Sequence, residues 1–279
     1  MHVPSLGAGT WCLAAEYFSI SNTFVEFCFK YAHGEVRVRS RVSKTLRLGN
    51  SEFIIHNCTM APFLTAGPFS AQNGEGRQLF SDVSIEIHDG ELVVLDGPSG
   101  SGKSTLIRQL VGMVPIEDVT RVLASETYTG LQLPRWRSRV TLVAQDAPML
   151  AGTVGENIRF PFDQRCSGGG TPDAARLREL LEVTGLDGIP EERDIGTLSG
   201  GERHRLALVR GLLWDPPVLV ADEPLSGLDE ERSAECFSLL LDFAHRGGHA
   251  VICVLHDRSL AVRADRRIPL VSASAEVPA

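Results

Sequence analysis

Eight residues in the first half of the chain have types and a spacing suited to phosphate chemistry. They read GPSGSGKS over residues 97–104 and fit the pattern G-x-x-x-x-G-K-S. Glycines permit the tight turns that aim successive backbone N–H groups into one concavity, where they hold an anion. A lysine at the seventh position reaches the outer phosphates of a nucleoside triphosphate, and the following serine ligates Mg²⁺. The predicted phosphate-binding residues are Gly97, Pro98, Ser99, Gly100, Ser101, Gly102, Lys103, Ser104 and Thr105.

The use of lysine in this motif supports the prediction. From residue 60 onward the chain contains 20 arginines and a single lysine, Lys103. A chain that otherwise prefers arginine therefore keeps a compact ammonium at the position where a point charge must fit between phosphates. The alternative is a Gly/Ser-rich turn between a strand and a helix, which the apolar run before the motif disfavours.

A second candidate is a pair of neighbouring carboxylates, Asp222 and Glu223. They follow residues 217–221, PVLVA, whose apolar character predicts a strand of a buried parallel sheet. Carboxylates at a buried strand end are costly unless a positive charge compensates them, and Mg²⁺ on Asp222 would do so. Glu223 would then orient or deprotonate a water molecule. A solvated acidic turn is the alternative that the apolar strand disfavours.

Two further polar residues follow predicted strands. Gln145 comes just after the expected strand 136–143, where its amide could meet Mg²⁺ or an attacking water. His256 follows the expected strand 250–255 and lies at the sheet edge where open α/β sheets bind ligands, so it could donate to the γ-phosphate. Taken alone, Gln145 would be a solvated loop residue and His256 a structural histidine.

The segment LSGGE, residues 198–202, predicts a second anion site. Ser199 and Glu202 have the spacing of a helix capping box, which by itself indicates only a well-capped helix. Gly200 and Gly201 are nevertheless poor helix formers, each about 1 kcal/mol worse than Ala. A helix N-terminus without side chains is what the close approach of a phosphate requires.

The elements around these residues predict an α/β fold. The alternating pattern of residues 79–87 predicts a half-buried strand, and an apolar strand precedes the glycine-rich loop. Residues 146–190 read as a helical insertion, and a helix is expected from about residue 230 to 246. Phe69, ahead of the Asn73-Gly74 turn, could stack on a purine or belong to the core.

Composition excludes some classes of function. The net charge of −8 argues against a nucleic-acid partner, and no apolar run is long enough to cross a bilayer. Residues 1–59 differ from the rest, with no Asp and a charge of +2 from 6 basic and 4 acidic side chains. We expect this segment to be a poorly ordered N-terminal extension outside the working fold, with Met60 as a possible true start.

The order of these motifs, from the phosphate loop through LSGGE and VLVADE to His256, resembles the ATP-binding subunits of ABC transporters over residues 60–270. The resemblance implies a P-loop NTPase of the ABC type. Its ATPase domain would span residues 60–275, with a parallel-sheet core, an antiparallel β subdomain and a helical subdomain at about 146–205. ATP and Mg²⁺ would be bound.

The resemblance also implies roles for the matched residues. Glu223 would be the catalytic base and His256 the switch, while Gln145 would sense Mg²⁺ and the membrane partner. Ser199, Gly200, Gly201 and Glu202 would clamp the γ-phosphate of ATP held by a second copy. Asp222 would assist Mg²⁺, Asp229 of the SGLD segment would lie at the dimer seam, and Phe69 would be the adenine-stacking aromatic.

We therefore expect a homodimer of ATPase subunits on the cytoplasmic face of the cell membrane, peripherally bound to a multi-span permease on a separate chain. GTVGENIRFPF, residues 152–162, looks similar to bacterial iron exporters. The alternative is a soluble ABC ATPase of DNA repair or translation. The interval between Gln145 and Ser199 is too short for the coiled coil of repair enzymes, and the single phosphate loop differs from the two of translation factors. The transported substrate and its direction stay open.

Overall fold

The computed structural model describes residues 61–116, 118–146, 148–164 and 170–270, together with five short strands between residues 17 and 54. The chain divides into two compact units, residues 1–61 and 62–279. In the first unit, β1-β2-β3 form an antiparallel sheet and β4-β5 a hairpin. These strands are β1 (Tyr17–Ile20), β2 (Thr23–Phe27), β3 (Val38–Arg39), β4 (Thr45–Leu48) and β5 (Ser51–Ile54). The expected poor order of residues 1–59 stays a prediction, because most of that segment lies outside the described residues.

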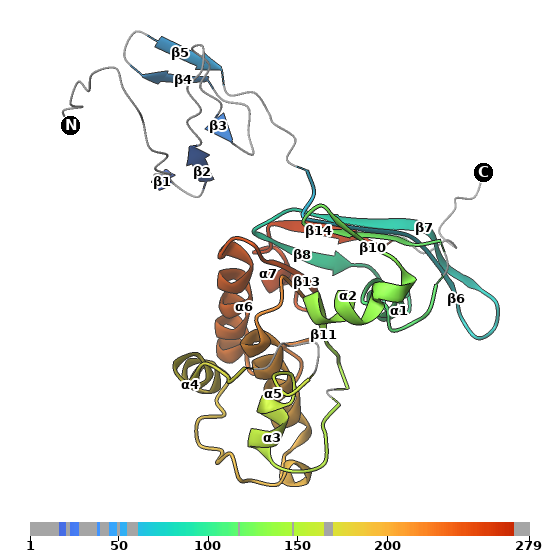
Figure 1. The fold of residues 1–279 in the computed structure, drawn as a ribbon, viewed down its shortest axis with the longest axis vertical. Helices are drawn as coiled ribbons and strands as arrows, with labels where there is room; N and C mark the ends of the chain where they lie inside the picture. The colour runs from blue at the N-terminus through green and yellow to red at the C-terminus, as the bar shows by residue number, and fades with distance from the viewer. Residues whose placement is uncertain are drawn as a thin grey trace. The chain divides into compact units, whose positions relative to one another are not determined.

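Two sheets form the frame of the second unit (Figure 1). The first is antiparallel in the order β10-β9-β6-β7, with β6 (Leu64–Gln72), β7 (Gln78–Ile87), β9 (Thr120–Leu123) and β10 (Glu126–Tyr128). The second is parallel in the order β11-β12-β13-β8-β14, with β8 (Glu91–Asp96), β11 (Val140–Val143), β12 (Val218–Asp222), β13 (Ala250–Val254) and β14 (Arg266–Pro269). The parallel core and antiparallel β subdomain implied by the resemblance are both confirmed.

Both faces of the parallel sheet are buried, which explains why its strands are apolar throughout. Successive side chains of a strand point to opposite faces. On β8, Leu92 and Val94 accordingly belong to one hydrophobic cluster and Val93 and Leu95 to the other. The sheet thus separates two cores and holds the ends of its strands rigidly.

Helices cover both faces of this sheet. α1 (Lys103–Leu110) and α2 (Leu133–Arg139) contribute to the core that the sheet shares with β6, β7 and β9. α5 (Gly200–Trp214), α6 (Glu230–His245) and the short α7 (Arg258–Ala261) contribute to the other core. Because the loops after β8, β11, β12 and β13 leave the same edge of the sheet, the residues in these loops are collected in one place.

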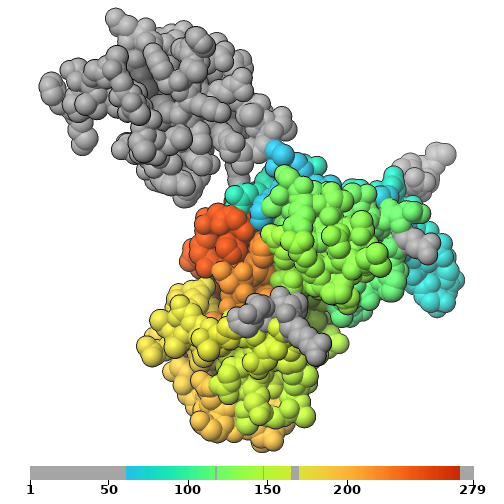
Figure 2. Space-filling model, viewed as in Figure 1, coloured from blue at the N-terminus to red at the C-terminus, as the bar shows by residue number. Residues whose placement is uncertain are grey.

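The helical region lies below the sheets in the view of Figure 1 and forms a lobe of its own in Figure 2. It contains α3 (Val154–Arg159), α4 (Ala174–Val183), the 3₁₀ helix η3 (Ile195–Thr197) and the first part of α5. Thr153 caps α3 and Asp173 caps α4, because their side-chain oxygens accept hydrogen bonds from first-turn N–H groups. These helices lie in and just after the region 146–190 that was expected to be a helical insertion, and the bounds of about 146–205 for a helical subdomain stay a prediction.

One predicted element is wrong in part. The expected strand 136–143 is helix α2 up to Arg139 and becomes strand only at Val140. Pro134 occupies the first turn of the helix, which suits its fixed φ. Trp136 is fully buried and its indole N–H donates to the carbonyl of Leu110 at 2.9 Å. Packing against α1 therefore decides the conformation of a stretch whose short pattern fits a helix and a strand equally.

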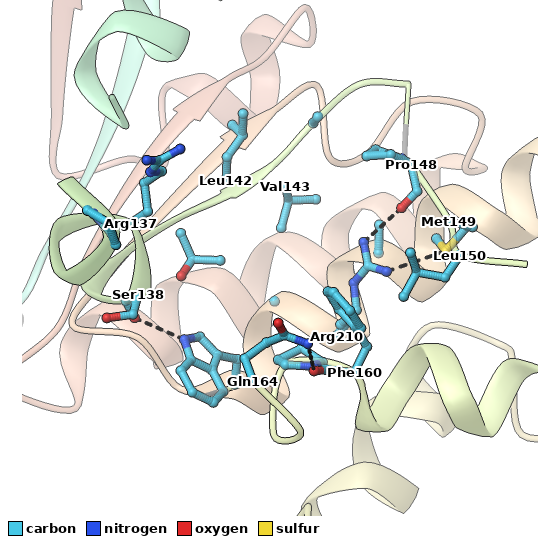
Figure 3. Close-up of a pocket in the computed structure, with 17 residues that line it drawn as sticks. Arg137, Ser138, Leu142, Val143, Pro148, Met149, Leu150, Phe160, Gln164 and Arg210 are labelled. Carbon is cyan, nitrogen blue, oxygen red and sulfur yellow. Dashed lines mark hydrogen bonds between the residues drawn. The ribbon is translucent and has the colours of Figure 1, made fainter. Parts of the chain in front are cut away.

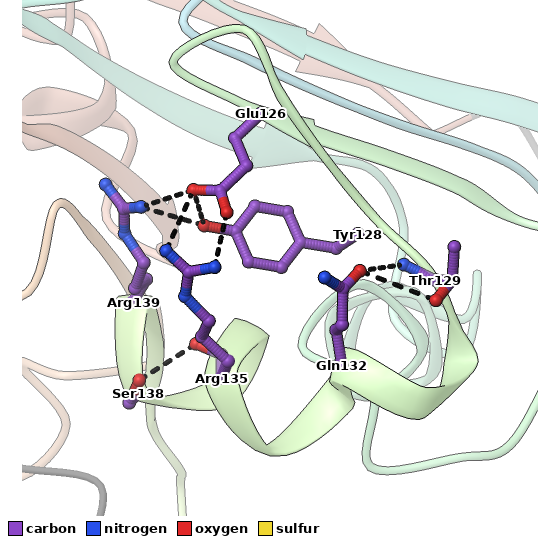
Figure 4. Close-up of polar contacts among 7 residues, drawn as sticks. All are labelled: Glu126, Tyr128, Thr129, Gln132, Arg135, Ser138 and Arg139. Atoms are coloured by element: carbon purple, nitrogen blue, oxygen red, sulfur yellow. Dashed lines mark hydrogen bonds and ion pairs between the residues drawn. The ribbon is translucent and has the colours of Figure 1, made fainter.

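A polar cluster joins α2 to β10 (Figure 4). The Glu126 carboxylate pairs with Arg135 at 2.5 Å and with Arg139 at 3.0 Å. The Tyr128 hydroxyl donates to Glu126 at 2.8 Å and accepts from Arg139 at 2.8 Å. Burial raises the pKa of Tyr128, so this hydroxyl stays a neutral donor at physiological pH. The short 3₁₀ helix η1 (Gly130–Gln132), capped by Thr129, connects the two elements.

Candidate functional site

The phosphate loop between β8 and α1 is closed on itself in this structure. Gly97, Gly100 and Gly102 have φ values of 156°, 77° and 95°, a region that favours glycine. A Cβ on Gly97 would lie 2.8 Å from the carbonyl oxygen of Leu270, so no side chain fits there. The Lys103 ammonium donates to the carbonyls of Gly97 at 2.8 Å and Pro98 at 3.0 Å. The single lysine of the described residues thus lies across the loop, where an anion would compete for it.

The loop also contains Ser99, Ser101 and Thr105. Ser99 is exposed, whereas Ser101 is buried and its hydroxyl has no hydrogen-bond partner among the described residues. Thr105 follows Ser104 in the first turn of α1, whose N-terminus carries the positive end of the helix dipole. The nine predicted residues therefore form one continuous loop and helix start.

Ser104 and Asp222 make the position best suited to a divalent cation. Asp222 is 4% exposed and its Oδ1 has no partner among the described residues. Burial raises the pKa of this carboxyl, while a hydrogen bond with the Ser104 side chain opposes the shift. An incompletely paired carboxylate beside a hydroxyl supplies the oxygen ligands that Mg²⁺ prefers. No group of three or more His, Cys, Asp or Glu side chains suited to a metal occurs within the described ranges, so other ligands would come from phosphate and water.

The Glu223 carboxylate is contacted by two side chains from other loops. These side chains are Gln145 and His256. The Gln145 amide donates to Glu223 Oε2 at 2.9 Å, and His256 Nε2 lies 2.6 Å from Glu223 Oε1. Glu223 has a φ of 53°, which a non-glycine residue adopts only where its surroundings impose it. Its backbone N–H donates to Val254 of β13 at 3.2 Å, and this bond fixes the turn. The structure brings these three predicted residues together.

His204 is a functional candidate that the sequence reasoning missed. It lies on α5, is 7% exposed and has an Nε2 without a partner among the described residues. Burial lowers its pKa, although the charges of Glu223 and Asp222 oppose that shift, so the imidazole is neutral at physiological pH. Its position five residues after Ser199, on the helix that the capping box predicts, is the only signal the sequence offers.

The second predicted anion site is the N-terminus of α5. Ser199 Oγ accepts from the N–H of Glu202 at 3.2 Å, and Glu202 Oε2 accepts from the N–H of Ser199 at 2.7 Å. The capping box is therefore present, and these bonds lower the pKa of Glu202. The Ser199 side chain also hydrogen-bonds to the Glu202 carboxylate, so an anion at this helix tip would compete with Glu202 for the hydroxyl. Gly200 is exposed and nothing lies within 4 Å of where its Cβ would be.

This helix tip and the phosphate loop are separate surfaces of one chain. Among the described residues, no hydrogen bond or ion pair joins residues 199–202 to residues 97–105. Arg193 approaches Glu202 at 3.6 Å instead. The chain therefore offers two distinct groups of anion-binding donors.

Two further predicted site residues have different outcomes. Asp229 caps α6, where its Oδ1 accepts from the N–H of Arg232 at 2.9 Å, and its side chain is 64% exposed. A role at a dimer seam stays a prediction. The adenine-stacking role of Phe69 is wrong, because this ring lies in β6 with 0% exposure and belongs to the hydrophobic core.

A pocket of about 440 Å³ lies between β11, α5 and the loop that leads to α3 (Figure 3). Arg210 lies at its wall, where the guanidinium donates to the carbonyl of Pro148 at 3.0 Å and contacts the sulfur of Met149. Leu150 and Phe160 at its rim are large apolar side chains with 43% and 38% exposure. The pocket wall includes Ala144. The next residue in the chain is Gln145, which donates to the Glu223 carboxylate.

Comparison with known proteins agrees with this geometry. The ABC transporter family model matches residues 80–226. The aliphatic sulfonates import ATP-binding protein SsuB 2 of Burkholderia cenocepacia is 34% identical over 197 residues, covering 70% of this chain and 69% of that protein. The probable iron export ATP-binding protein FetA of Escherichia coli is 30% identical over 193 residues, covering 69% of this chain and 84% of that protein. Proteins named for import and for export are thus both similar to this chain.

Solved structures show the same fold. A bacterial Atm1-family ABC exporter with ATP bound aligns with a TM-score of 0.64 and 23% identity over 76% of this chain and 38% of that chain. The protein cbiO1 from Clostridium perfringens, part of the ABC transporter complex cbiONQ, aligns with a TM-score of 0.60 and 22% identity over 75% of this chain and 84% of its own. At this level of identity the likeness concerns the fold.

Proposed function

This chain belongs to the ABC transporter family as an ATP-binding and ATP-hydrolysing subunit, and from that premise we propose that two copies hydrolyse ATP at composite sites. In each site the phosphate loop of one copy would hold a MgATP that the α5 tip of the other copy completes. A head-to-tail pair related by a twofold axis has two such sites. The proposal extends to a separate multi-span membrane permease, which the pair would power from the cytoplasmic face of the membrane.

The separation of the two anion-binding surfaces is the observation that carries the proposal. The loop of residues 97–105 has the lysine, and its Ser104 side chain hydrogen-bonds to Asp222. The tip of α5 has the Ser199 hydroxyl, an exposed Gly200 and a helix dipole, but no carboxylate placed to act as a base. A nucleotide held between the two surfaces would use both sets of donors, and we propose that the two sets come from different copies.

The arrangement of residues suggests how hydrolysis proceeds. The Glu223 carboxylate takes a proton from a water as that water attacks the γ-phosphorus, and the bond from this phosphorus to the β–γ bridging oxygen breaks. Gln145 and His256 hold the carboxylate from both sides, so its orientation costs little at the moment of reaction. Lys103 would leave its two loop carbonyls for the phosphates. Ser104 and Asp222 would hold Mg²⁺, which would supply positive charge to the leaving diphosphate.

The pocket beside Gln145 is proposed as the place where the permease docks. Its rim exposes Leu150 and Phe160, and its wall holds the cations Arg137 and Arg210. A short amphipathic cytoplasmic helix of a membrane protein, with apolar and acidic side chains, fits this chemistry. No described helix of this chain is long and apolar enough to span a bilayer. We propose that the cargo is iron and that it is exported. The similarity to FetA of Escherichia coli supports this proposal.

Docking of the permease can be tested by replacing a residue at the rim of this pocket. Phe160→Asp places a charge on the rim without disturbing the phosphate loop, and Arg159→Ala, which removes an exposed ion pair with Glu191, is the matched control on α3. We expect the wild type and the control to co-purify with the permease in detergent, and Phe160→Asp to lose it while binding ATP normally. Equal recovery of the permease with all three proteins would contradict docking at this pocket.

Vesicles test the transport step. Inverted vesicles that contain the permease and the ATPase should accumulate ferrous iron with ATP and should fail to do so with the Glu223→Gln variant. Accumulation of another solute instead of iron would refute iron as the cargo but would still support the role of this chain in a transporter. Failure of any membrane protein to associate, together with ATP hydrolysis at an undiminished rate, would favour the soluble ABC ATPase alternative.

A further inference from the structure

The burial of Phe69 leaves the base end of the nucleotide without the stacking ring that the sequence predicted. The hairpin tip that follows, residues 70–78, reads SAQNGEGRQ and has no aromatic residue. Phe80, the next ring, is 1% exposed and packs in the core. If the chain binds a nucleoside triphosphate as proposed above, other side chains must contact the base.

The β6–β7 hairpin is attached to the phosphate loop, which fixes where the base contacts lie. A Cβ on Gly102 would meet the Phe80 ring at 2.9 Å and the Leu79 Cβ at 3.2 Å, so β7 packs directly on the loop. The Gln109 amide of α1 donates to the carbonyl of Ser70 in β6 at 2.9 Å. Figure 1 shows the hairpin running past α1 and ending beyond it. A nucleoside whose phosphates lie at the loop therefore has its base along this hairpin.

Two glutamines form the next pair of side chains along the hairpin. Gln72 of β6 and Gln78 of β7 are partners in the register of the sheet. Gln78 precedes Phe80 by two residues, and two residues of a strand span about 7 Å. The Gln72 amide nitrogen donates to the Gln78 carbonyl oxygen at 3.2 Å, and the Gln78 amide nitrogen donates to the Phe80 carbonyl at 2.6 Å. Asn73 accepts from the N–H groups of Glu75 and Arg77, and this fixes the turn that holds the pair.

The pair has both kinds of hydrogen-bonding group to spare. The Gln72 oxygen is an unused acceptor, and each amide nitrogen retains one N–H. Adenine offers a donor beside an acceptor on its edge, and guanine offers the reverse, so a pair with both kinds of group can satisfy either base. Because Gln72 is exposed and Gln78 is half-buried, water satisfies the groups that a base leaves unpaired, and the penalty that enforces discrimination is absent.

We propose that Gln72 and Gln78 form the base-contacting surface of the nucleotide site, and that this surface accepts adenine and guanine nucleotides with similar affinity. The inference rests on the proposed function and adds its nucleotide specificity. It makes the phosphates, held by the loop, the main source of affinity. The pair positions the base and does not select it.

The test measures binding of MgATP, MgGTP and magnesium tripolyphosphate to the full chain carrying Glu223→Gln, which prevents turnover during titration. We expect Kd values for ATP and GTP within about threefold of each other, a difference below 1 kcal/mol. Gln72→Ala in the same background should weaken both nucleotides by a similar factor and leave tripolyphosphate unchanged. Gln72→Tyr should tighten both, by about fivefold or more, because it adds a stacking ring. Ser81→Ala, an exposed change on the same strand, is the matched control.

The outcomes separate this inference from the function on which it rests. A preference for ATP of tenfold or more, or unchanged nucleotide affinity in Gln72→Ala, would overturn the inference and leave the ATPase intact. Absence of both ATP and tripolyphosphate binding to the Glu223→Gln chain would instead refute the phosphate site itself.

Discussion

At the scale of single residues, the proposed chemistry of this chain depends on Glu223. Its carboxylate is held between the Gln145 amide and the His256 imidazole, and its backbone has a φ of 53°. A rigid carboxylate near the position of the γ-phosphate can accept a proton without first reorganising. Neither neighbour is close to Glu223 in sequence, so the topology of the parallel sheet is what creates the cluster.

Replacing this carboxylate separates binding from chemistry. Glu223→Gln keeps an acceptor for Gln145 but removes the basic oxygen, so we expect turnover to fall by about two orders of magnitude or more. ATP affinity should be unchanged, because Lys103 and the loop donors are intact. Steady-state phosphate release and equilibrium binding measure the two effects. Unchanged turnover would dismiss Glu223 as the base.

Asp222 gives a prediction with a definite sign. Burial raises the pKa of this carboxyl above its ordinary value of 3.8, so its stabilising effect is present at acid pH and is lost as the pH rises through the folded pKa. At pH 7.5 the ionised group destabilises the free protein. Asp222→Asn should therefore raise the Tm without nucleotide, on the order of 2 °C for a domain of this size, and should reduce the stabilisation by MgATP.

Asp96→Asn is a control that should change the Tm in the opposite direction. The Arg267 ion pair lowers the pKa of Asp96, so its stabilising effect is present at neutral pH and is lost as the pH falls through the folded pKa. This substitution should lower the Tm at pH 7.5. Thermal unfolding of both variants between pH 4 and 8 checks the pair of predictions. A fall in Tm for Asp222→Asn without nucleotide would contradict the destabilising burial of its carboxylate, and undiminished stabilisation by MgATP would contradict a cation at that position.

At the scale of elements, the N-terminus of α5 has a glycine that its own fold does not require. Nothing lies within 4 Å of the position of a Cβ on Gly200, whereas a Cβ on Gly211 of the same helix would lie 2.6 Å from Val143. Gly211 is therefore explained by packing of α5 on the sheet. Packing within this chain does not explain Gly200, and we propose that a phosphate approaches it closely.

The two glycines predict opposite consequences for the same substitution. Gly200→Ala should leave the free energy of unfolding unchanged or slightly increased, because Ala is the better helix former, but it should abolish ATP-driven association. Gly211→Ala should lower stability because the helix must move away from β11. Denaturant unfolding and ATP-dependent association measure the two properties. Normal association of Gly200→Ala would remove the reason for placing a phosphate at this tip.

Much of this element pattern could be predicted from the sequence, because the buried parallel strands are continuous apolar runs and the loops carry distinctive glycines. The strand before Asp222, the strand before His256 and the helix from about residue 230 to 246 were all predicted within a few residues. The failures were Trp136 and Phe69. Each is an aromatic residue whose place depends on packing with elements distant in the chain, which a local pattern does not contain.

The candidate site shows the same division. Gln145, Glu223 and His256 were predicted because each follows a strand of one parallel sheet, whose ends must converge. His204 could not be predicted from the sequence, because its burial depends on how α5 packs on that sheet. The amide pair of Gln72 and Gln78 follows from the sheet register, and no short motif marks it.

At the scale of the whole molecule, one chain has two separate groups of anion-binding donors, which we propose to be half-sites for the same ligand. The phosphate loop belongs to the sheet region, and the α5 tip belongs to the helical lobe (Figure 2). We propose that a triphosphate bound at the phosphate loop of one copy is completed by the α5 tip of the other. ATP would therefore act as the link between two copies, and hydrolysis at Glu223 would release that link.

The most direct test measures the mass of the full-length Glu223→Gln protein by sedimentation, with and without MgATP, alone and mixed with Ser199→Ala, Glu223→Gln. We predict a monomer without nucleotide, a dimer with MgATP, and a weaker dimer once the Ser199 hydroxyl is missing from one copy. A protein that binds MgATP yet stays monomeric, alone and with its permease, would contradict the composite site.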